Sequence, residues 1–165
     1  MPDTIGKYRD LLLSEGCSRR VIAHCEAVSA VAMQYTGPGT GADRDLVLAG
    51  AMLHDIGRSE THGIGHAQAG AGICRRLGLP EEVARIVECH TGAGLTADEC
   101  SLLGLMPIDC VPKTLEEKIV ANADNLVGGG HEISIGHDLM DSFALKRTAR
   151  SRIYRLWLEM EMYRE

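Results

Sequence analysis

The feature that most constrains the fold is the spacing of apolar residues, which recur every three or four positions along most of the chain. This spacing places them on one face of a helix, and no segment shows the regular alternation of a half-buried strand. The sequence therefore predicts an all-α protein. Between residues 19 and 35, for example, the repeat consists of Val21, His24, Val28, Val31 and Tyr35.

Glycine, proline and capping residues divide this pattern into helices. At 165 residues the chain is the size of one domain, and we expect a single helical bundle of six to seven helices over residues 1–165. Residues 91–113 are mixed, with a short helix expected at 98–103. The longer helices are expected at 3–15, 19–35, from Asp43 to His54-Asp55, at 65–77, at 81–90, after a capping box at Thr114 and Glu117, and at 137–162.

The composition limits which classes of partner and substrate the chain can bind. The net charge of −6 argues against an extended nucleic acid or an acidic membrane surface as partner, but a small phosphorylated substrate remains compatible because a metal supplies local positive charge. The six cysteines form no Cys-x-x-Cys pair, and no run is long and apolar enough for a signal peptide or a membrane span. We therefore expect reduced cysteines in a cytoplasmic protein.

Six polar residues fall on the apolar faces or at the inner ends of the expected helices. Buried carboxylates are rare unless they are paired or bound to a metal, and four imidazoles in an aliphatic core lack neutral partners. Imidazole and carboxylate suit Fe, Mn, Co, Ni or Zn, and the absence of thiolate argues against a structural zinc site. One or two divalent transition metals are therefore predicted, with His24, His54, Asp55, His66, His90 and Asp124 as ligands.

The order of these residues resembles the HD-domain superfamily of metal-dependent phosphohydrolases, over about residues 19–127. The signature consists of His24, then His54-Asp55 within Ala51-Met52-Leu53-His54-Asp55-Ile56-Gly57, then Asp124 within Ala121-Asn122-Ala123-Asp124. Gly65-His66-Ala67 and Cys89-His90-Thr91-Gly92 resemble the subgroup with two metals, to which the YqeK-type hydrolases of diadenosine tetraphosphate are similar.

The resemblance implies that His24, His54, Asp55 and Asp124 hold one metal, and that Asp55 bridges to a second metal completed by two further histidines, His66 and His90. It also implies cleavage of a phosphate ester or anhydride of a nucleotide or another small phosphorylated metabolite by a hydroxide that bridges the metals.

Cations near these motifs are candidates for phosphate contacts. Arg58 corresponds to the cation after His-Asp, and Lys118 to a lysine six residues before the final aspartate. For each, a solvated surface cation without a substrate contact is an equally good interpretation. His62, in a glycine-bounded loop, is a further substrate candidate, although a plain loop histidine is the simpler interpretation.

Two other stretches have plainer interpretations. Gly128-Gly129-Gly130 follows a helix, so it is expected to be a flexible stop and not a phosphate loop. The basic stretch 146–152 is expected to be a solvated or subunit-contacting face. The last helix is expected either to cover the site or to form a homodimer.

Three alternatives remain open from the sequence. Some HD-domain proteins use the same ligands for a mixed-valence di-iron centre that activates oxygen. A second alternative is a non-catalytic module that retains a metal or nucleotide. A purely structural helical protein is disfavoured because it would leave Asp55 and Asp124 buried without partners, at a cost of several kcal/mol each.

Overall fold

The computed structural model describes residues 3–141 and 145–165, and its first three helices each begin at a polar cap. The carboxylate of Asp3 accepts a hydrogen bond from the Gly6 amide, Ser18 caps with its hydroxyl, and Asp43 accepts from two amides. These caps satisfy amide groups that have no partner inside a helix. The elements that follow them are α1 (Thr4–Ser14), α2 (Arg19–Ala32) with the short 3-10 turn η1 (Met33–Tyr35), and α3 (Arg44–Leu53).

The middle of the chain follows the expected order. Thr96 with Glu99, and Thr114 with Glu117, form complete capping boxes, and the second confirms the box predicted from sequence. The expected short helix near 98–103 is also present. The elements are η2 (Ile56–Ser59), α4 (His66–Arg76), α5 (Glu81–Cys89), α6 (Ala97–Leu102) and α7 (Leu115–Asn125).

The carboxyl-terminal part differs from the prediction. The single helix expected over 137–162 is wrong, because α8 (Ile135–Asp141) and α9 (Arg147–Met160) are separate helices. Lys146, directly before α9, has extended backbone angles (φ −58°, ψ 145°) that a continuous helix does not allow. Phe143, expected in the apolar stripe of that helix, lies outside the described residues.

The glycine run is also more ordered than expected. Instead of a flexible stop, it forms a small antiparallel hairpin of β1 (Val127–Gly128) and β2 (His131–Glu132). The turn residues Gly129 and Gly130 both have positive φ (60° and 80°). Two consecutive positive φ angles are typical of the type I′ turn that joins two-residue hairpins, and glycine adopts them without strain.

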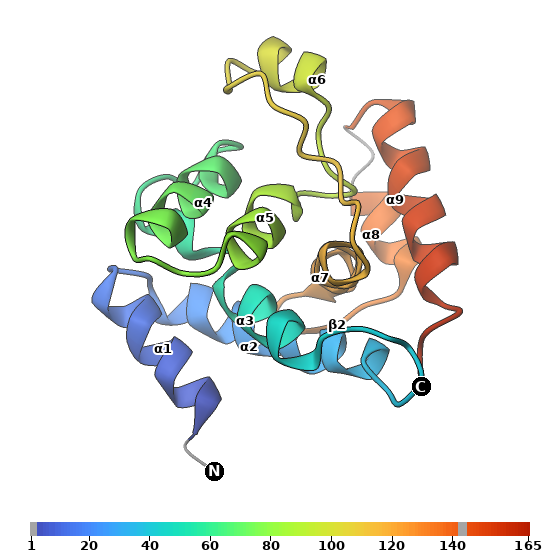
Figure 1. The fold of residues 1–165 in the computed structure, drawn as a ribbon. Helices are drawn as coiled ribbons and strands as arrows, with labels where there is room; N and C mark the ends of the chain where they lie inside the picture. Colours follow the sequence, from blue (N-terminus) through green and yellow to red (C-terminus); the bar gives the residue numbers. More distant parts are fainter. Residues whose placement is uncertain (1–2, 142–144) are drawn as a thin grey trace.

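Helix α7 forms the axis of the bundle. In Figure 1 it is seen end-on, with α2, α3 and α5 on one side and α9 on the other. The larger core cluster joins these helices through fully buried residues such as Val28, Val47, Ile119 and Met160. The prediction of an all-α fold is confirmed, and the described residues form nine α-helices, more than the six to seven expected.

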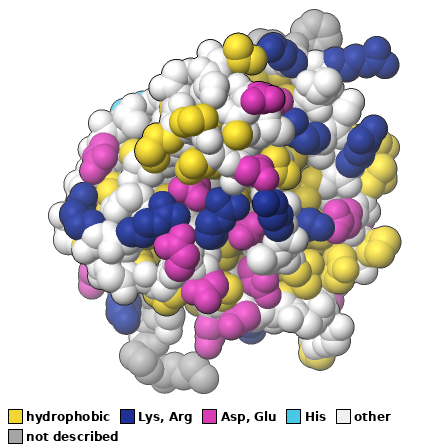
Figure 2. Space-filling view, turned by 45° about the horizontal axis from the view of Figure 1, so that its top comes forward, with side chains coloured by type: hydrophobic (Ala, Val, Ile, Leu, Met, Phe, Trp, Pro, Cys, Tyr) yellow, Lys and Arg dark blue, Asp and Glu magenta, His cyan; other side chains and the backbone are white. Residues whose placement is uncertain are grey.

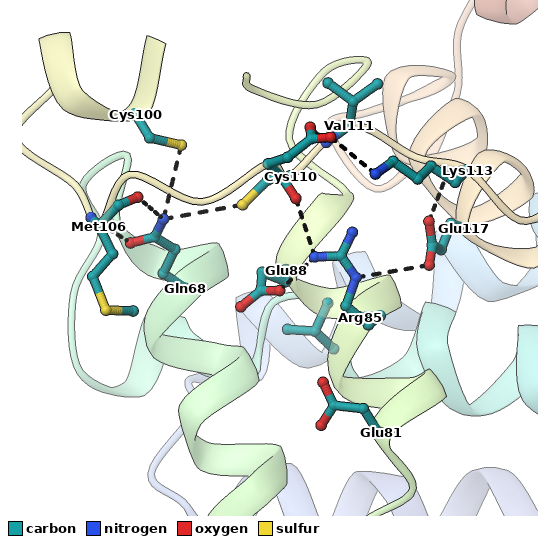
Figure 3. Close-up of polar contacts among 12 residues, drawn as sticks. Gln68, Glu81, Arg85, Glu88, Cys100, Met106, Cys110, Val111, Lys113 and Glu117 are labelled. Carbon is teal, nitrogen blue, oxygen red and sulfur yellow. Dashed lines mark hydrogen bonds and ion pairs between the residues drawn. The ribbon is translucent and has the colours of Figure 1, made fainter. Parts of the chain in front are cut away.

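The mixed region 91–113 forms an arm that carries α6 (Figure 1). An isolated bridge joins Leu95 to Cys110 at its base. The side-chain amide of Gln68 donates to the Met106 carbonyl (2.9 Å) and accepts from the Met106 amide (3.0 Å), and Arg85 donates to the Asp109 carbonyl (3.2 Å). Figure 3 shows how these side chains of α4 and α5 hold the arm.

Two further predictions concern the whole chain. All six cysteines are free and buried, as expected for reduced thiols. Within the described ranges, no helix has both the length and the apolarity that crossing a membrane requires.

Candidate metal centre

The six predicted ligands come together from five helices, most of them at helix boundaries. His24 lies within α2 and Asp124 near the end of α7. The other four residues occupy helix boundaries: His54-Asp55 directly follows α3, His66 opens α4, and His90 directly follows α5. These four side chains are all buried.

One group of ligands forms around Asp124. Its Oδ1 atom lies 2.9 Å from His24 Nε2 and 3.6 Å from His54 Nε2. These three ligand atoms all lie within 4.8 Å of one another. Two imidazole nitrogens and one carboxylate oxygen at such separations can bind a divalent transition metal.

A second group forms around Asp55. Its Oδ1 atom lies 3.2 Å from His66 Nε2 and 3.5 Å from His90 Nε2. Its other oxygen, Oδ2, is 3.8 Å from His54 Nε2 and 3.9 Å from His24 Nε2. The two oxygens of Asp55 therefore face the two groups of histidines, which is the arrangement of a bridging carboxylate.

Backbone carbonyls fix the orientation of three imidazoles. The Nδ1 atoms of His54, His66 and His90 lie 2.7, 2.8 and 2.7 Å from the carbonyl oxygens of residues 51, 63 and 87. Because a carbonyl only accepts, Nδ1 carries the proton in each ring. Nε2 is then left with a lone pair directed at the cluster, as metal ligation requires.

The buried polar atoms test whether a metal fits. His54 Nε2 and Asp55 Oδ1 are buried and make no hydrogen bond within the described part of the chain. Leaving such atoms unsatisfied is costly, and a cation at the cluster satisfies both. The donor set of imidazoles and carboxylates therefore fits one or two divalent cations.

The neighbours also set the charges of the ligands. Burial alone would raise the pKa of the Asp55 carboxyl, but the adjacent histidines outweigh it and hold that pKa well below its usual range. The same balance of burial against His24 and His54 lowers the pKa of Asp124. Both carboxyls are therefore ionised throughout the neutral range, as metal ligands must be.

The centre opens into a cleft of about 560 Å³, whose wall includes His24 and Asp55. Arg58 and His62, the candidates for substrate contacts, also line the cleft. The Nε atom of Arg58 donates to Asp55 Oδ2 (3.0 Å), and its Nη1 atom donates to the His62 carbonyl (3.0 Å). Arg58 therefore links the loop to the bridging carboxylate.

Lys118 does not join this cleft. Its ammonium lies 2.7 Å from Glu159 of α9, and it lines a different pocket together with Arg152 and Arg155. Six positions along a helix turn by about 600°, so Lys118 and Asp124 point in different directions from α7. On the face shown in Figure 2, basic side chains are interleaved with acidic ones, so that face offers no broad basic surface.

Sequence reasoning missed two residues that shape the centre. Arg20 lines the cleft from the first turn of α2, four positions before His24 and therefore on the same helix face. Gly57 allows η2 to approach α4 so closely that an added Cβ would overlap the His66 carbonyl. The i, i+4 relation to His24 was the available signal for Arg20, whereas nothing local marked the packing of Gly57.

Fold and site together define a helical metal-binding domain with a His/Asp centre. The HD domain family matches residues 21–128, and the chain belongs to this family, as its motifs predicted. The uncharacterized protein MJ0778 of Methanocaldococcus jannaschii is 49% identical over 128 residues, which cover 75% of this chain and 76% of that protein.

Two further comparisons concern larger or more distant proteins. A tRNA (cytidine(56)-2′-O)-methyltransferase of Picrophilus torridus is 46% identical over 91% of this chain, but the chain spans only 44% of that protein. The HD domain of the L. monocytogenes phosphodiesterase PgpH, solved in complex with cyclic-di-AMP, superposes with a TM-score of 0.58 at 16% identity. That alignment covers 96% of this chain and 98% of the PgpH chain, and it shows a shared fold.

Proposed function

We propose that this chain is a metal-dependent phosphohydrolase that cleaves a phosphate ester or anhydride of a nucleotide or another small phosphorylated metabolite. The observation that carries the proposal is a pair of buried atoms, His54 Nε2 and Asp55 Oδ1, that make no hydrogen bond to any described residue and lie beside a cleft that Arg58 also lines. A cation satisfies these atoms, and an anionic substrate can reach them from the cleft.

The chemistry requires metals that the six ligands would hold. Divalent cations in such a site supply a nucleophile derived from water at neutral pH and neutralise the charge that develops on a phosphoryl group. His24, His54 and Asp124 would hold one metal, His66 and His90 the other, and Asp55 would bridge them.

Arg58 would bind and orient the phosphate. Two of its nitrogens are already used, by Asp55 and by the His62 carbonyl, and these bonds fix the plane of the guanidinium. Within the described residues its Nη2 atom makes no hydrogen bond, so it remains available to a phosphate oxygen. A fixed guanidinium loses less freedom on binding, which favours a charged hydrogen bond of defined direction.

A phosphodiester is the first substrate class to test. The PgpH domain that shares this fold is a phosphodiesterase solved with a cyclic dinucleotide, and the methyltransferase relative is named for an RNA. These names support a nucleotide substrate for the present chain. The diadenosine tetraphosphate specificity of the YqeK-type subgroup remains a prediction, and such anhydrides belong in the same screen.

The test combines elemental analysis of the purified protein with hydrolysis assays. Bis-p-nitrophenyl phosphate, p-nitrophenyl phosphate, cyclic dinucleotides, short ribonucleotides and diadenosine tetraphosphate are offered with Mn, Co, Ni, Fe or Mg. We expect about two transition metals per chain and metal-dependent release of product. The Asp124→Asn variant serves as the matched control, since it removes one charged ligand and should lose the signal.

Two results would contradict the proposal. Hydrolysis that persists in Asp124→Asn would come from a contaminating enzyme. About two irons per chain with oxygen consumption and no hydrolysis would favour the oxygen-activating alternative instead.

A further inference from the structure

The cleft has an arginine that the proposed mechanism does not use. Arg20 lines the cleft together with His24, Asp55 and Arg58. Its side chain is exposed, and within the described residues it makes no hydrogen bond and no ion pair. Arg58, in contrast, is held by Asp55 and the His62 carbonyl. Of the two arginines in the cleft, Arg20 is therefore the one whose donors are all free for a ligand.

The position of Arg20 separates it from the metal cluster. It precedes His24 by four residues on α2, which corresponds to about 6 Å along the helix axis. The backbone amides of this first turn add partial positive charge, and Ser18, whose hydroxyl caps the Val21 amide, lines the cleft as well. An anionic group bound here would lie one helical turn from a phosphate at the metals.

The hairpin turn leaves room for such a ligand. Gly129 and Gly130, the turn of the β-hairpin, line the same cleft without side chains. A Cβ added at Gly130 would meet no atom within 4 Å, so the space beside the turn is open. The same cleft is thus lined by the metal cluster, by the start of α2 and by the hairpin turn, and its volume of about 560 Å³ exceeds what a single phosphate fills.

We propose that the first turn of α2 forms a subsite for a second phosphate group of the substrate, with Arg20 as its binding residue. This inference rests on the proposed function and narrows the substrate class to nucleotides that carry two phosphates. The second phosphate is either a 5′-phosphate on a dinucleotide or the additional phosphate of a nucleoside diphosphate. Arg58 and the metal cluster would bind the phosphate that reacts.

The experiment compares Arg20→Ala with Arg19→Ala. Arg19 is the adjacent exposed residue of the same helical turn and does not line the cleft, so it controls for charge and helix stability. Rates are measured for the dinucleotides pApA and ApA, and for ADP and AMP. We expect kcat/KM of wild type and Arg19→Ala to be about tenfold higher for the substrate with the additional phosphate. A charged hydrogen bond contributes enough binding free energy for such a factor.

In Arg20→Ala we expect the ratio of the two kcat/KM values, with and without the additional phosphate, to fall to about one. Loss of the preference only for pApA over ApA assigns the subsite to a phosphodiester chain, and loss only for ADP over AMP assigns it to a diphosphate. An unchanged preference in Arg20→Ala, or no preference in wild type, overturns the subsite.

A binding measurement keeps the inference testable if no substrate is hydrolysed. Calorimetry of the metal-loaded protein with pApA, ApA, ADP and AMP then gives the same four comparisons without turnover. Absence of hydrolysis counts against the proposed function, whereas tighter binding of the additional phosphate that Arg20→Ala abolishes still supports the subsite. Equal affinities in wild type, Arg19→Ala and Arg20→Ala would overturn it.

Discussion

The Nε2 atoms of His66 and His90 lie 3.0 Å apart, although the Nδ1 atom of each ring is already bonded to a backbone carbonyl. With a proton on each Nδ1, two lone pairs face one another at this distance and repel. Asp55 Oδ1, 3.2 and 3.5 Å from the same two nitrogens, adds a third electron-rich atom. Three donors directed at one point form a cation site, because a shared positive charge converts their repulsion into attraction.

Replacing Asp55 should therefore affect both halves of the centre. In Asp55→Asn the bridging charge is lost, and we expect metal affinity to fall by at least about 100-fold, more than the loss typical of residues behind a ligand. Turnover should be lost with the metal. Elemental analysis after dialysis and a hydrolysis assay measure both effects. Asp10→Asn, an exposed change on α1, is the control, and full activity in Asp55→Asn would refute the bridging role.

The stability of the metal-free protein should depend on pH in a defined direction. Burial alone lowers the pKa of the His54 imidazole, but Cys25 and the carboxylates of Asp55 and Asp124 outweigh it and raise that pKa well above the usual value. A raised folded-state pKa gives stability that is complete below the unfolded pKa, near 6.5, and is lost as pH rises through the folded value. Burial lowers the pKa of His90, which opposes this effect near pH 6, but the shift at His54 is the larger. The metal-free protein should therefore melt at a lower temperature at pH 8.5 than at pH 6.

The stabilisation by added metal should instead increase with pH, since the ion replaces the proton on His54. At a metal concentration 100 times the Kd, binding adds about 2.7 kcal/mol, and for a chain of this size Tm should rise by about 5–10 °C. This rise should be larger at pH 8.5 than at pH 6. Melting curves with Mn and with a chelator at both pH values measure it, and a larger rise at pH 6 would contradict the assignment.

Most of the fold and the clustering of the six candidate ligands were predictable from the sequence, because both depend on local signals. Helix starts follow from caps such as Ser18, Asp43 and Thr114, and the ligands are polar residues on apolar helix faces. The break before α9 and the Gly129-Gly130 turn were not predicted. The Gly-Gly pair is compatible with a hairpin turn, but two flanking strands of two residues each are too short to show an alternating pattern.

The phosphate contacts were harder to predict, since they depend on directions in space. Lys118 was assigned by its spacing from Asp124, but α9 provides it with Glu159 as a partner. Arg20, by contrast, shares a face with His24 and reaches the cleft. A spacing of six residues does not place a cation on the ligand face of a helix, whereas a spacing of four does.

Lys118→Ala should consequently leave substrate binding unchanged. The side chains of Lys118 and Glu159 are 27% and 45% exposed, so solvent screens their ion pair. Its loss should lower the free energy of unfolding by at most about 1 kcal/mol. Steady-state kinetics should give the KM and kcat of wild type within error, with a small decrease in Tm. A tenfold increase in KM would restore Lys118 as a substrate-binding residue.

Arg58→Ala should have a mixed effect. The side chain is proposed to bind phosphate, and it also donates to Asp55 Oδ2 at 3.0 Å. We therefore expect kcat/KM to fall by about 100-fold and metal affinity by about tenfold, the lower end of the loss seen for residues that orient a ligand. Kinetics at saturating metal separate the two effects. If saturating metal restores full kcat/KM, Arg58 serves only to orient Asp55.

The last prediction concerns the packing that brings His54-Asp55 beside His66. A Cβ at Gly57 would overlap the His66 carbonyl oxygen and lie 2.5 Å from the Gly70 amide nitrogen. Backbone atoms cannot yield as a flexible side chain can, so Gly57→Ala must push η2 away from α4. We expect a loss of about 1–3 kcal/mol, or about 3–10 °C in Tm, together with weaker metal binding.

Gly72→Ala is the matched control on the same helix pair. A Cβ at Gly72, in the interior of α4, would meet no atom within 4 Å, so the substitution should stabilise the helix by about 0.5–1 kcal/mol. The melting temperature should therefore fall in Gly57→Ala and rise in Gly72→Ala. Metal titrations should show weaker binding in Gly57→Ala and unchanged affinity in Gly72→Ala. Stability and metal affinity of Gly57→Ala equal to those of wild type would show that the close approach of η2 to α4 is not required for the metal centre.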